Sequence, residues 1–127
     1  TAAIRPGLAL PPELDLALRD ADEAQARAVA MGGISLAPGH VRLPRGTAVE
    51  SLADFREGAW WVQDLAASLP ARLLGAGTTE TGARSALDLC AAPGGKTMQL
   101  AAAGWKVTAL DLSKRRLDLL KENLKRT

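Results

Sequence analysis

Alternating hydrophobic and polar positions predict a β-strand near the start of the chain. Within residues 13–19, Leu14, Leu16 and Leu18 occupy every second position. A period of two is typical of a strand that buries one face and exposes the other. We therefore expect a half-buried strand at this place.

A helix and a hairpin are predicted to follow. Asp20 or Asp22 is placed to cap a helix that runs to about Met31. Two short apolar runs, residues 34–36 and 41–43, flank a Pro-Gly turn and predict a hairpin. This β-α-β-β segment is too small for a complete domain and is typical of part of a small α+β module.

A second helix is predicted after a connecting stretch. Trp60-Trp61 opens a segment in which Leu65, Leu69 and Leu73 recur at four-residue spacing, which indicates one apolar helix face. Pro70 falls inside this pattern, so we expect the helix to kink or restart there. The tryptophan pair favours packing over stacking on nucleic-acid bases.

The last third of the chain reads as strand, helix, strand, helix. The nearly continuous apolar run at residues 85–90 predicts a parallel strand covered on both faces. A helix at residues 95–103 and a strand at residues 106–110 follow, and Ser113 caps a final helix. The apolar stripe of that helix comprises Leu117, Leu120 and Leu124. The order of elements predicts an α/β fold.

Charge is distributed unevenly along the 127 residues. Residues 1–64 hold six Lys or Arg against nine Asp or Glu, whereas residues 65–127 hold ten against five. A basic half favours a polyanionic partner, and residues 114–116 are placed to contact RNA phosphates. A solvated helix face explains the same charges equally well.

Composition narrows the class of protein further. Hydrophobic residues make up 47% of the chain, which excludes a disordered tail. The single cysteine, Cys90, excludes an intrachain disulfide and fits a reducing compartment. No apolar run has membrane-spanning length and no signal peptide is visible, so we expect a cytoplasmic protein without a membrane partner. The single histidine, His40, lacks a second ligand candidate, so we expect no metal site.

The most informative motif is the turn of small residues at 90–97, between the predicted strand and helix. Such a turn lets a ligand approach bare backbone at a helix N-terminus. Asp111 ends the next strand. A glycine turn after one strand and an acid after the next is the layout of a nucleoside-binding βαβ unit.

Two phosphate-binding interpretations fit this turn poorly. Gly95-Lys96-Thr97 ends like a P-loop, but Cys90 stands where that loop needs its first glycine. The turn also lacks the Gly-x-Gly-x-x-Gly order of dinucleotide folds. S-adenosylmethionine fits better, because it has no phosphate and its ribose diol can donate to an acid such as Asp111. An acid near a helix N-terminus is the alternative interpretation of Asp111.

The strings LDLCAAPGGKT and ALDLSKRRLDLLKENLKR resemble the Sun/Fmu-type members of the Nol/Nop/Sun family, which are bacterial RNA cytosine-5 methyltransferases. The upstream strings FREGAWWVQDLAASLPARLL and PPELDLALR resemble the same family. The resemblance implies a Rossmann-like class I methyltransferase domain preceded by a small α+β RNA-binding module. It further implies S-adenosylmethionine as cofactor and RNA, specifically 16S ribosomal RNA, as partner.

The resemblance also implies roles for particular residues. Asp111 would hold the ribose, and Gln63 and Asp64 would lie near the cofactor pocket. The implied cofactor loop comprises Cys90, Ala91, Ala92, Pro93, Gly94, Gly95 and Lys96.

Three regions are expected. Residues 1–45, which begin with a Pro-rich linker at residues 1–12, form the tail of the RNA-binding module. Residues 46–84 form a linker and helix, and residues 85–127 form the first half of the cofactor-binding domain.

The expected chemistry needs a nucleophile that this segment lacks. A cysteine thiolate must add to carbon 6 of cytosine before carbon 5 attacks the methyl group. The family uses two cysteines, both beyond the matched segment, and we interpret Cys90 as a buried packing cysteine. We therefore expect no catalytic residue here and an inactive fragment of a longer enzyme. There are two alternatives. The chain could be a non-catalytic fragment that binds RNA or a cofactor, or part of a methyltransferase with another acceptor.

Overall fold

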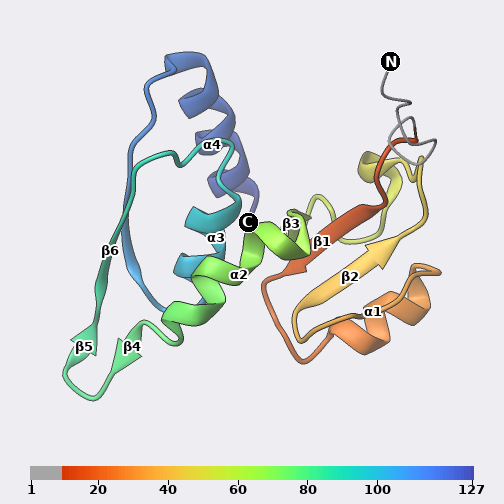
Figure 1. The fold of residues 1–127 in the computed structure, drawn as a ribbon, viewed down its shortest axis with the longest axis horizontal. Helices are drawn as coiled ribbons and strands as arrows, with labels where there is room; N and C mark the ends of the chain where they lie inside the picture. The colour runs from red at the N-terminus through yellow and green to blue at the C-terminus, as the bar shows by residue number, and fades with distance from the viewer. Residues whose placement is uncertain (1–9) are drawn as a thin grey trace, which may run out of the picture.

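The computed structural model describes residues 10–127 and contains two groups of elements (Figure 1). One is a small antiparallel sheet with a helix on it, and the other is a βαβα unit. Helix α2 (Leu65–Leu74) lies between them in the chain. Most of the predicted linker at residues 1–12 lies outside the described residues.

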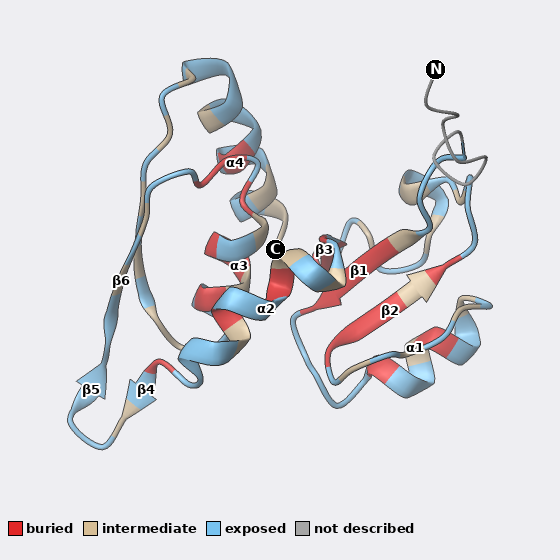
Figure 2. Cartoon of the chain, in the orientation of Figure 1, coloured by how far each residue is buried: buried red, intermediate tan, exposed pale blue. Residues whose placement is uncertain are grey.

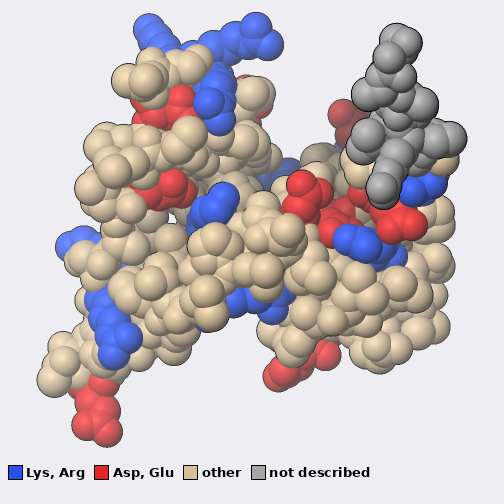
Figure 3. All heavy atoms as spheres, in the orientation of Figure 1, with Lys and Arg blue, Asp and Glu red and all other residues tan. Residues whose placement is uncertain are grey.

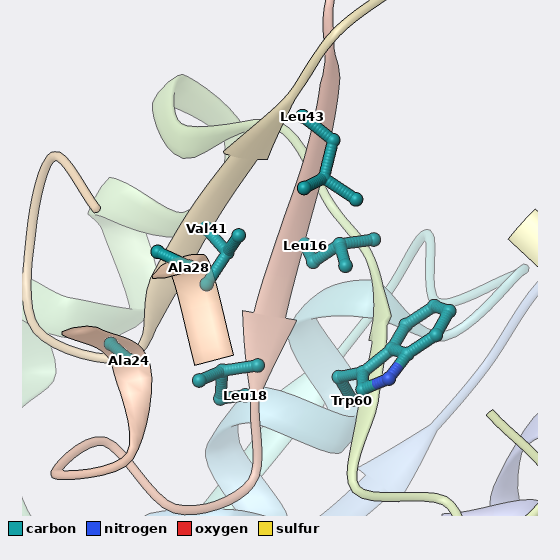
Figure 4. Packing of buried hydrophobic residues seen from close by; sticks show 7 residues of the cluster. All are labelled: Leu16, Leu18, Ala24, Ala28, Val41, Leu43 and Trp60. Carbon is teal, nitrogen blue, oxygen red and sulfur yellow. The ribbon is translucent and has the colours of Figure 1, made fainter. Parts of the chain in front are cut away.

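The first sheet has the strand order β2 (His40–Leu43), β1 (Leu14–Leu18), β3 (Trp60–Val62), and all pairs are antiparallel. Strand β1 lies where the sequence predicts it. The order of strands and helices along the chain also agrees with the predicted α/β class. Helix α1 (Ala24–Ala30) covers one face of this sheet. The core between them comprises Leu16, Leu18, Ala24, Ala28, Val41, Leu43 and Trp60 (Figure 4).

Strand β1 is buried on both faces, contrary to the prediction of a half-buried strand (Figure 2). Leu16 and Leu18 face the α1 core. Ala17 belongs to a second cluster with Trp61 and Met98, because elements of the following unit cover the other face. Asp15 of the same strand is buried as well, with 4% of its surface exposed.

The start of α1 and the hairpin differ from the sequence prediction. Neither aspartate caps α1, since Asp20 Oδ1 instead accepts from the backbone N–H of Asp22, at 3.0 Å. The helix begins later, after Glu23. Of the predicted hairpin, only β2 is a strand, and Ile34 contributes one isolated bridge to Arg42.

The tryptophan pair forms strand β3, so the prediction that it opens a helix was wrong. A strand points successive side chains to opposite faces, and this buries Trp60 in the α1 core and Trp61 beside Met98. Trp60 Nε1 also donates to the carbonyl of Ala53 at 2.9 Å. The packing role predicted for both rings is confirmed, because Trp60 is 0% and Trp61 3% exposed.

Helix α2 continues through Pro70, so the predicted restart does not occur. Its buried residues are Ser68 and Ala71, whereas Leu69 and Leu73 of the expected apolar face are exposed. The leucine spacing therefore marked the outer face of this helix. The inner face uses small side chains, which allow α2 to approach its neighbours closely.

The second unit follows its predicted order. Strands β6 (Ser85–Asp88) and β7 (Lys106–Ala109) pair in parallel, and α3 (Gly95–Ala102) connects them. Ser113 Oγ accepts from the backbone N–H of Arg116, as predicted, and α4 (Lys114–Arg126) follows. The remaining short elements are the 3₁₀ turn Val49–Ser51 and the β4 (Thr78–Thr79) and β5 (Gly82–Ala83) hairpin.

One face of the parallel pair is uncovered in the described residues (Figure 2). Leu87 in β6 is 58% exposed, and Leu110 after β7 is 50% exposed. Within the described residues, β6 therefore lacks the cover on one face that the sequence predicts. Separately, no helix within residues 10–127 has the length and apolar character to cross a membrane.

A buried carboxylate joins the first sheet to α2. Asp15 accepts from Arg42 Nε and Nη2 at 2.7 and 2.8 Å, and from the backbone N–H of Leu65 at 2.9 Å. His40 Nε2 lies 3.2 Å from Asp15 Oδ2. The Arg42 hydrogen bond, against the opposing effect of burial, holds the pKa of Asp15 well below its usual range.

We expect Asp15→Asn to lower the free energy of unfolding by about 2–3 kcal/mol. The amide keeps the shape but loses the charge that Arg42 and the helix N-terminus require. Urea denaturation followed by tryptophan fluorescence measures this change. Asp20→Asn is the matched control, because Asp20 is exposed; an equal loss in both variants would contradict the role given to Asp15.

Acid should destabilise the wild type through Asp15. The folded-state pKa of Asp15 lies below its unfolded value of about 4, so the unfolded chain binds more protons in acid. The contribution is fully present above about pH 4 and is lost as the pH falls further. The free energy of unfolding of the wild type should thus fall more steeply between pH 4 and 2 than that of Asp15→Asn; parallel curves would contradict the linkage.

Candidate functional site

The small-residue turn is a tightly fixed loop between β6 and α3. Ala91 donates its backbone N–H to the carbonyl of Leu110 at 3.0 Å, which attaches the loop to the end of β7. Thr97 Oγ1 donates to Asp88 Oδ2 at 2.8 Å and ties the first turn of α3 to the end of β6. The loop is therefore held at both ends.

Gly94 occupies a position that only glycine fits. Its φ is +117°, outside the range that L side chains ordinarily adopt. A Cβ there would lie 2.5 Å from Leu120 Cδ1. The glycine thus lets the loop pack directly against α4.

A cavity of about 260 Å³ adjoins this loop. It brings the predicted loop together with Gln63 and Asp64, which precede α2. Its lining residues are Val62, Gln63, Asp64, Ala67, Cys90, Ala91, Ala92, Pro93, Gly95 and Lys96. Gly94 and Asp111 are the two predicted site residues that do not line it. Val62 and Ala67 line it without having been singled out in the sequence.

A chain of side-chain hydrogen bonds fixes Gln63. Trp61 Nε1 donates to Gln63 Oε1 at 2.8 Å, and Gln63 Nε2 donates to Gln99 Oε1 at 2.9 Å. Gln99 Nε2 in turn donates to the carbonyl of Ser68 at 3.0 Å. These bonds connect β3, α2 and α3, so one wall of the cavity depends on all three elements.

Cys90 is exposed and lines the cavity, so its interpretation as a buried packing residue was wrong. Strand β6 ends at Asp88, two residues earlier than predicted. The thiol therefore lies in the loop and not inside the sheet. Lys96, in the first turn of α3, is also exposed beside the cavity.

Asp111 is already engaged by its own chain. Its side chain is 3% exposed, Oδ2 accepts from the backbone N–H of Ala92 at 3.1 Å, and Oδ1 accepts from that of Ser113 at 3.0 Å. The Ser113 bond, opposed by burial and supported by Ala92 and Arg116, lowers the pKa of Asp111. The contact of Asp111 with the start of α4 matches the helix-terminus interpretation; a ribose role stays a prediction.

The basic run at the start of α4 divides into two kinds of residue. Lys114 and Arg115 are exposed, at the end of the molecule where Figure 3 shows basic side chains projecting. Arg116 instead donates to the carbonyl of Ala92, and its Nη1 lies 3.6 Å from Asp111 Oδ2. The sequence did not indicate this contact.

No metal centre is evident within residues 10–127, where no three His, Cys, Asp or Glu side chains are grouped to hold an ion. His40 is 1% exposed, in the first sheet.

Comparisons with known proteins agree on one family. The model of the family described as 16S rRNA methyltransferase RsmB/F matches residues 78–127. The ribosomal RNA small subunit methyltransferase B of Proteus mirabilis is 42% identical over 91 residues, which are 70% of this chain and 21% of that protein. The chain thus spans about a fifth of the length of the curated relatives it matches.

Solved structures support the same assignment. The crystal structure of PH0851 has a TM-score of 0.73 and 25% sequence identity to this chain. The matched region covers 90% of this chain and 27% of the PH0851 chain. The crystal structure of NSun6 from Pyrococcus horikoshii with SFG has a TM-score of 0.53 and 33% sequence identity. The matched region covers 68% of this chain and 23% of the NSun6 chain. The family resemblance and the Rossmann-like α/β fold predicted from the sequence are confirmed. Residues 78–127 are thus similar to the 16S rRNA methyltransferase RsmB/F family.

Proposed function

We propose that this chain is part of an S-adenosylmethionine-dependent enzyme that methylates carbon 5 of a cytosine in 16S ribosomal RNA. The observation that carries the proposal is the cavity between the loop at residues 90–96 and the start of α2. The names of the relatives, and the structure of NSun6 with SFG, support this chemistry.

The cavity suits the methionine end of the cofactor. At about 260 Å³ it is smaller than the roughly 300–1,000 Å³ that encloses a whole drug-sized ligand. The N-terminus of α3 and the Lys96 ammonium would attract a carboxylate there. Asp64, which lines the cavity, supplies the opposite charge for the cationic amino end. When bound, the cofactor supplies an electrophilic methyl group.

Asp111 would hold the ribose. Each carboxylate oxygen has two acceptor sites, and the backbone N–H groups of Ala92 and Ser113 take one on each oxygen. In this proposal the remaining lone pairs would accept from the ribose hydroxyls. The lowered pKa keeps the group an anion, which is the form that accepts these bonds.

The proposal also assigns the regions of the chain. Residues 85–127 would be the first half of the cofactor domain, with β6, α3 and β7 as its first βαβ unit. The first sheet would be part of an RNA-binding α+β module. We extend that module from residue 45 to residue 62, because β3 pairs with β1.

The catalytic thiol would come from outside these residues. Cys90 lies in the loop that we assign to the cofactor, and the family resemblance places both catalytic cysteines beyond the matched segment. The RNA base therefore has to be attacked by a cysteine of another segment, and this chain would contribute the methyl donor.

Asp111→Asn should weaken S-adenosylmethionine binding by about tenfold or more, because a neutral amide accepts weaker hydrogen bonds than a carboxylate. Isothermal titration of the complete enzyme measures the dissociation constant. Asp118→Asn in α4 is the control, since the side chain of Asp118 is 55% exposed and pairs only with Lys121 among the described residues. Unchanged affinity in Asp111→Asn would refute the ribose role.

Cys90→Ala should retain methyl transfer to RNA, measured with a radiolabelled methyl donor, because the thiol is not the nucleophile. Removing a small exposed sulfur beside the cofactor should alter the Michaelis constant for S-adenosylmethionine at most severalfold. Loss of methyl transfer with intact cofactor binding would instead identify Cys90 as the nucleophile.

A further inference from the structure

Three side chains on one face of α4 contact the loop that lines the cavity. They are Arg116, Leu120 and Asn123, spaced by four and three residues, which places them in a row along a helix. Each contacts a different part of residues 91–94. The sequence showed only the leucine, as one member of an apolar stripe.

Arg116 holds the loop and Asp111 together. One guanidinium nitrogen, Nη2, donates to the carbonyl of Ala92, while Nη1 lies 3.6 Å from Asp111 Oδ2. The guanidinium is a planar fork with fixed donor directions, so it can serve both groups at once. The backbone N–H of Ala92 donates to the same carboxylate at 3.1 Å. Ala92 is therefore held through both its N–H and its carbonyl.

Leu120 and Asn123 continue the contact along the helix. Leu120 is 4% exposed and packs against Ala91 and Ala92. Asn123 Nδ2 donates to the carbonyl of Pro93 at 2.9 Å. Two consecutive loop carbonyls are thus bound by two side chains of the same helix, with an apolar contact between them.

The far end of α4 is itself anchored to the first unit. Arg126 Nη1 donates to the carbonyls of Phe55 and Trp60 at 2.8 and 3.0 Å, and its guanidinium carbon lies 4.2 Å from the centre of the Phe55 ring. The helix that holds the loop is therefore fixed at both ends.

We propose that Arg116 and Asn123 are positioning residues that keep the loop carbonyls of Ala92 and Pro93 turned onto α4, and so preform the cavity for S-adenosylmethionine. This inference rests on the proposed function for the identity of the ligand. Ala92 and Pro93 line the cavity on one side and bind α4 on the other. A loop ordered in advance loses less conformational entropy when its ligand binds.

The test uses Arg116→Lys and Asn123→Ala in the complete enzyme. Lysine keeps the charge and the aliphatic stem but has no fork, and alanine removes one hydrogen bond. Each variant should raise the dissociation constant of S-adenosylmethionine by about five- to tenfold. Amide hydrogen exchange of residues 91–97 should become faster in the same variants without the cofactor.

Arg115→Lys is the matched control, because Arg115 is the exposed neighbour of Arg116 and makes no hydrogen bond or ion pair with the described residues. It should leave cofactor affinity and loop exchange unchanged. The variants at 116 and 123 should raise the Michaelis constant for the cofactor but leave kcat and the Michaelis constant for RNA unchanged. A merely structural loss would instead lower kcat together with the melting temperature.

Asp111 supplies a second test through non-additivity. Because Arg116 contacts Asp111 as well as Ala92, the double variant Arg116→Lys with Asp111→Asn should weaken binding less than the product of the two single effects. Independent effects of the two substitutions would overturn the proposal. So would wild-type cofactor affinity together with wild-type loop exchange in both Arg116→Lys and Asn123→Ala. A rise in the RNA Michaelis constant alone would make Arg116 a phosphate contact instead.

The outcomes separate the two proposals. A wild-type enzyme that does not bind S-adenosylmethionine refutes the proposed function, whereas loop exchange still reports whether Arg116 and Asn123 order residues 91–97. Normal cofactor binding with unaltered exchange in the variants refutes the positioning role alone.

Discussion

The position of the cavity depends on one buried carboxylate in the first sheet. Asp15 binds Arg42 within the sheet and the first N–H of α2 outside it, while its backbone carbonyl accepts from Gln63 at 3.0 Å. Gln63 and Asp64 lie between these two anchors and line the cavity. A charge buried without such partners would be costly, so the sheet and the start of α2 form one unit. The small N-terminal sheet thereby contributes to a site that the glycine loop alone does not form.

Local sequence patterns correctly predicted the elements that depend on nearby residues. The alternation around β1, the connection by α3 and the Ser113 cap all depend on neighbours within a few residues. Strand β3 could not be found in this way, because Trp60 and Trp61 pack against β1, more than forty residues earlier, and Trp61 also packs against Met98, more than thirty residues later. The same holds for Asp15, which simple alternation assigns to the solvent face.

The candidate site was predictable as a list of residues but not as a geometry. The motif indicated the loop, and the cavity does gather most of it with Gln63 and Asp64. What fixes the loop comes from farther along the chain: Arg116 is 24 residues from Ala92, and Asn123 is 30 from Pro93. A run of basic residues has the same sequence pattern whether its side chains face solvent or bind the protein. The contact of Arg116 with Ala92 therefore had no signal in the sequence. The exposure of Cys90 was missed because the end of β6 was placed too late.

The anchoring of α4 at both ends restricts how this chain can evolve. Arg126 lies ten positions after Arg116, a rise of about 15 Å along the helix. Inserting or deleting one residue between them would rotate one anchor by about 100° relative to the other, so either the Ala92 contact or the Phe55 contact would be lost. Point substitutions on the outer face of α4 carry no such penalty. Homologous sequences should therefore vary freely on the outer face of this helix while keeping its length and its inward contacts constant.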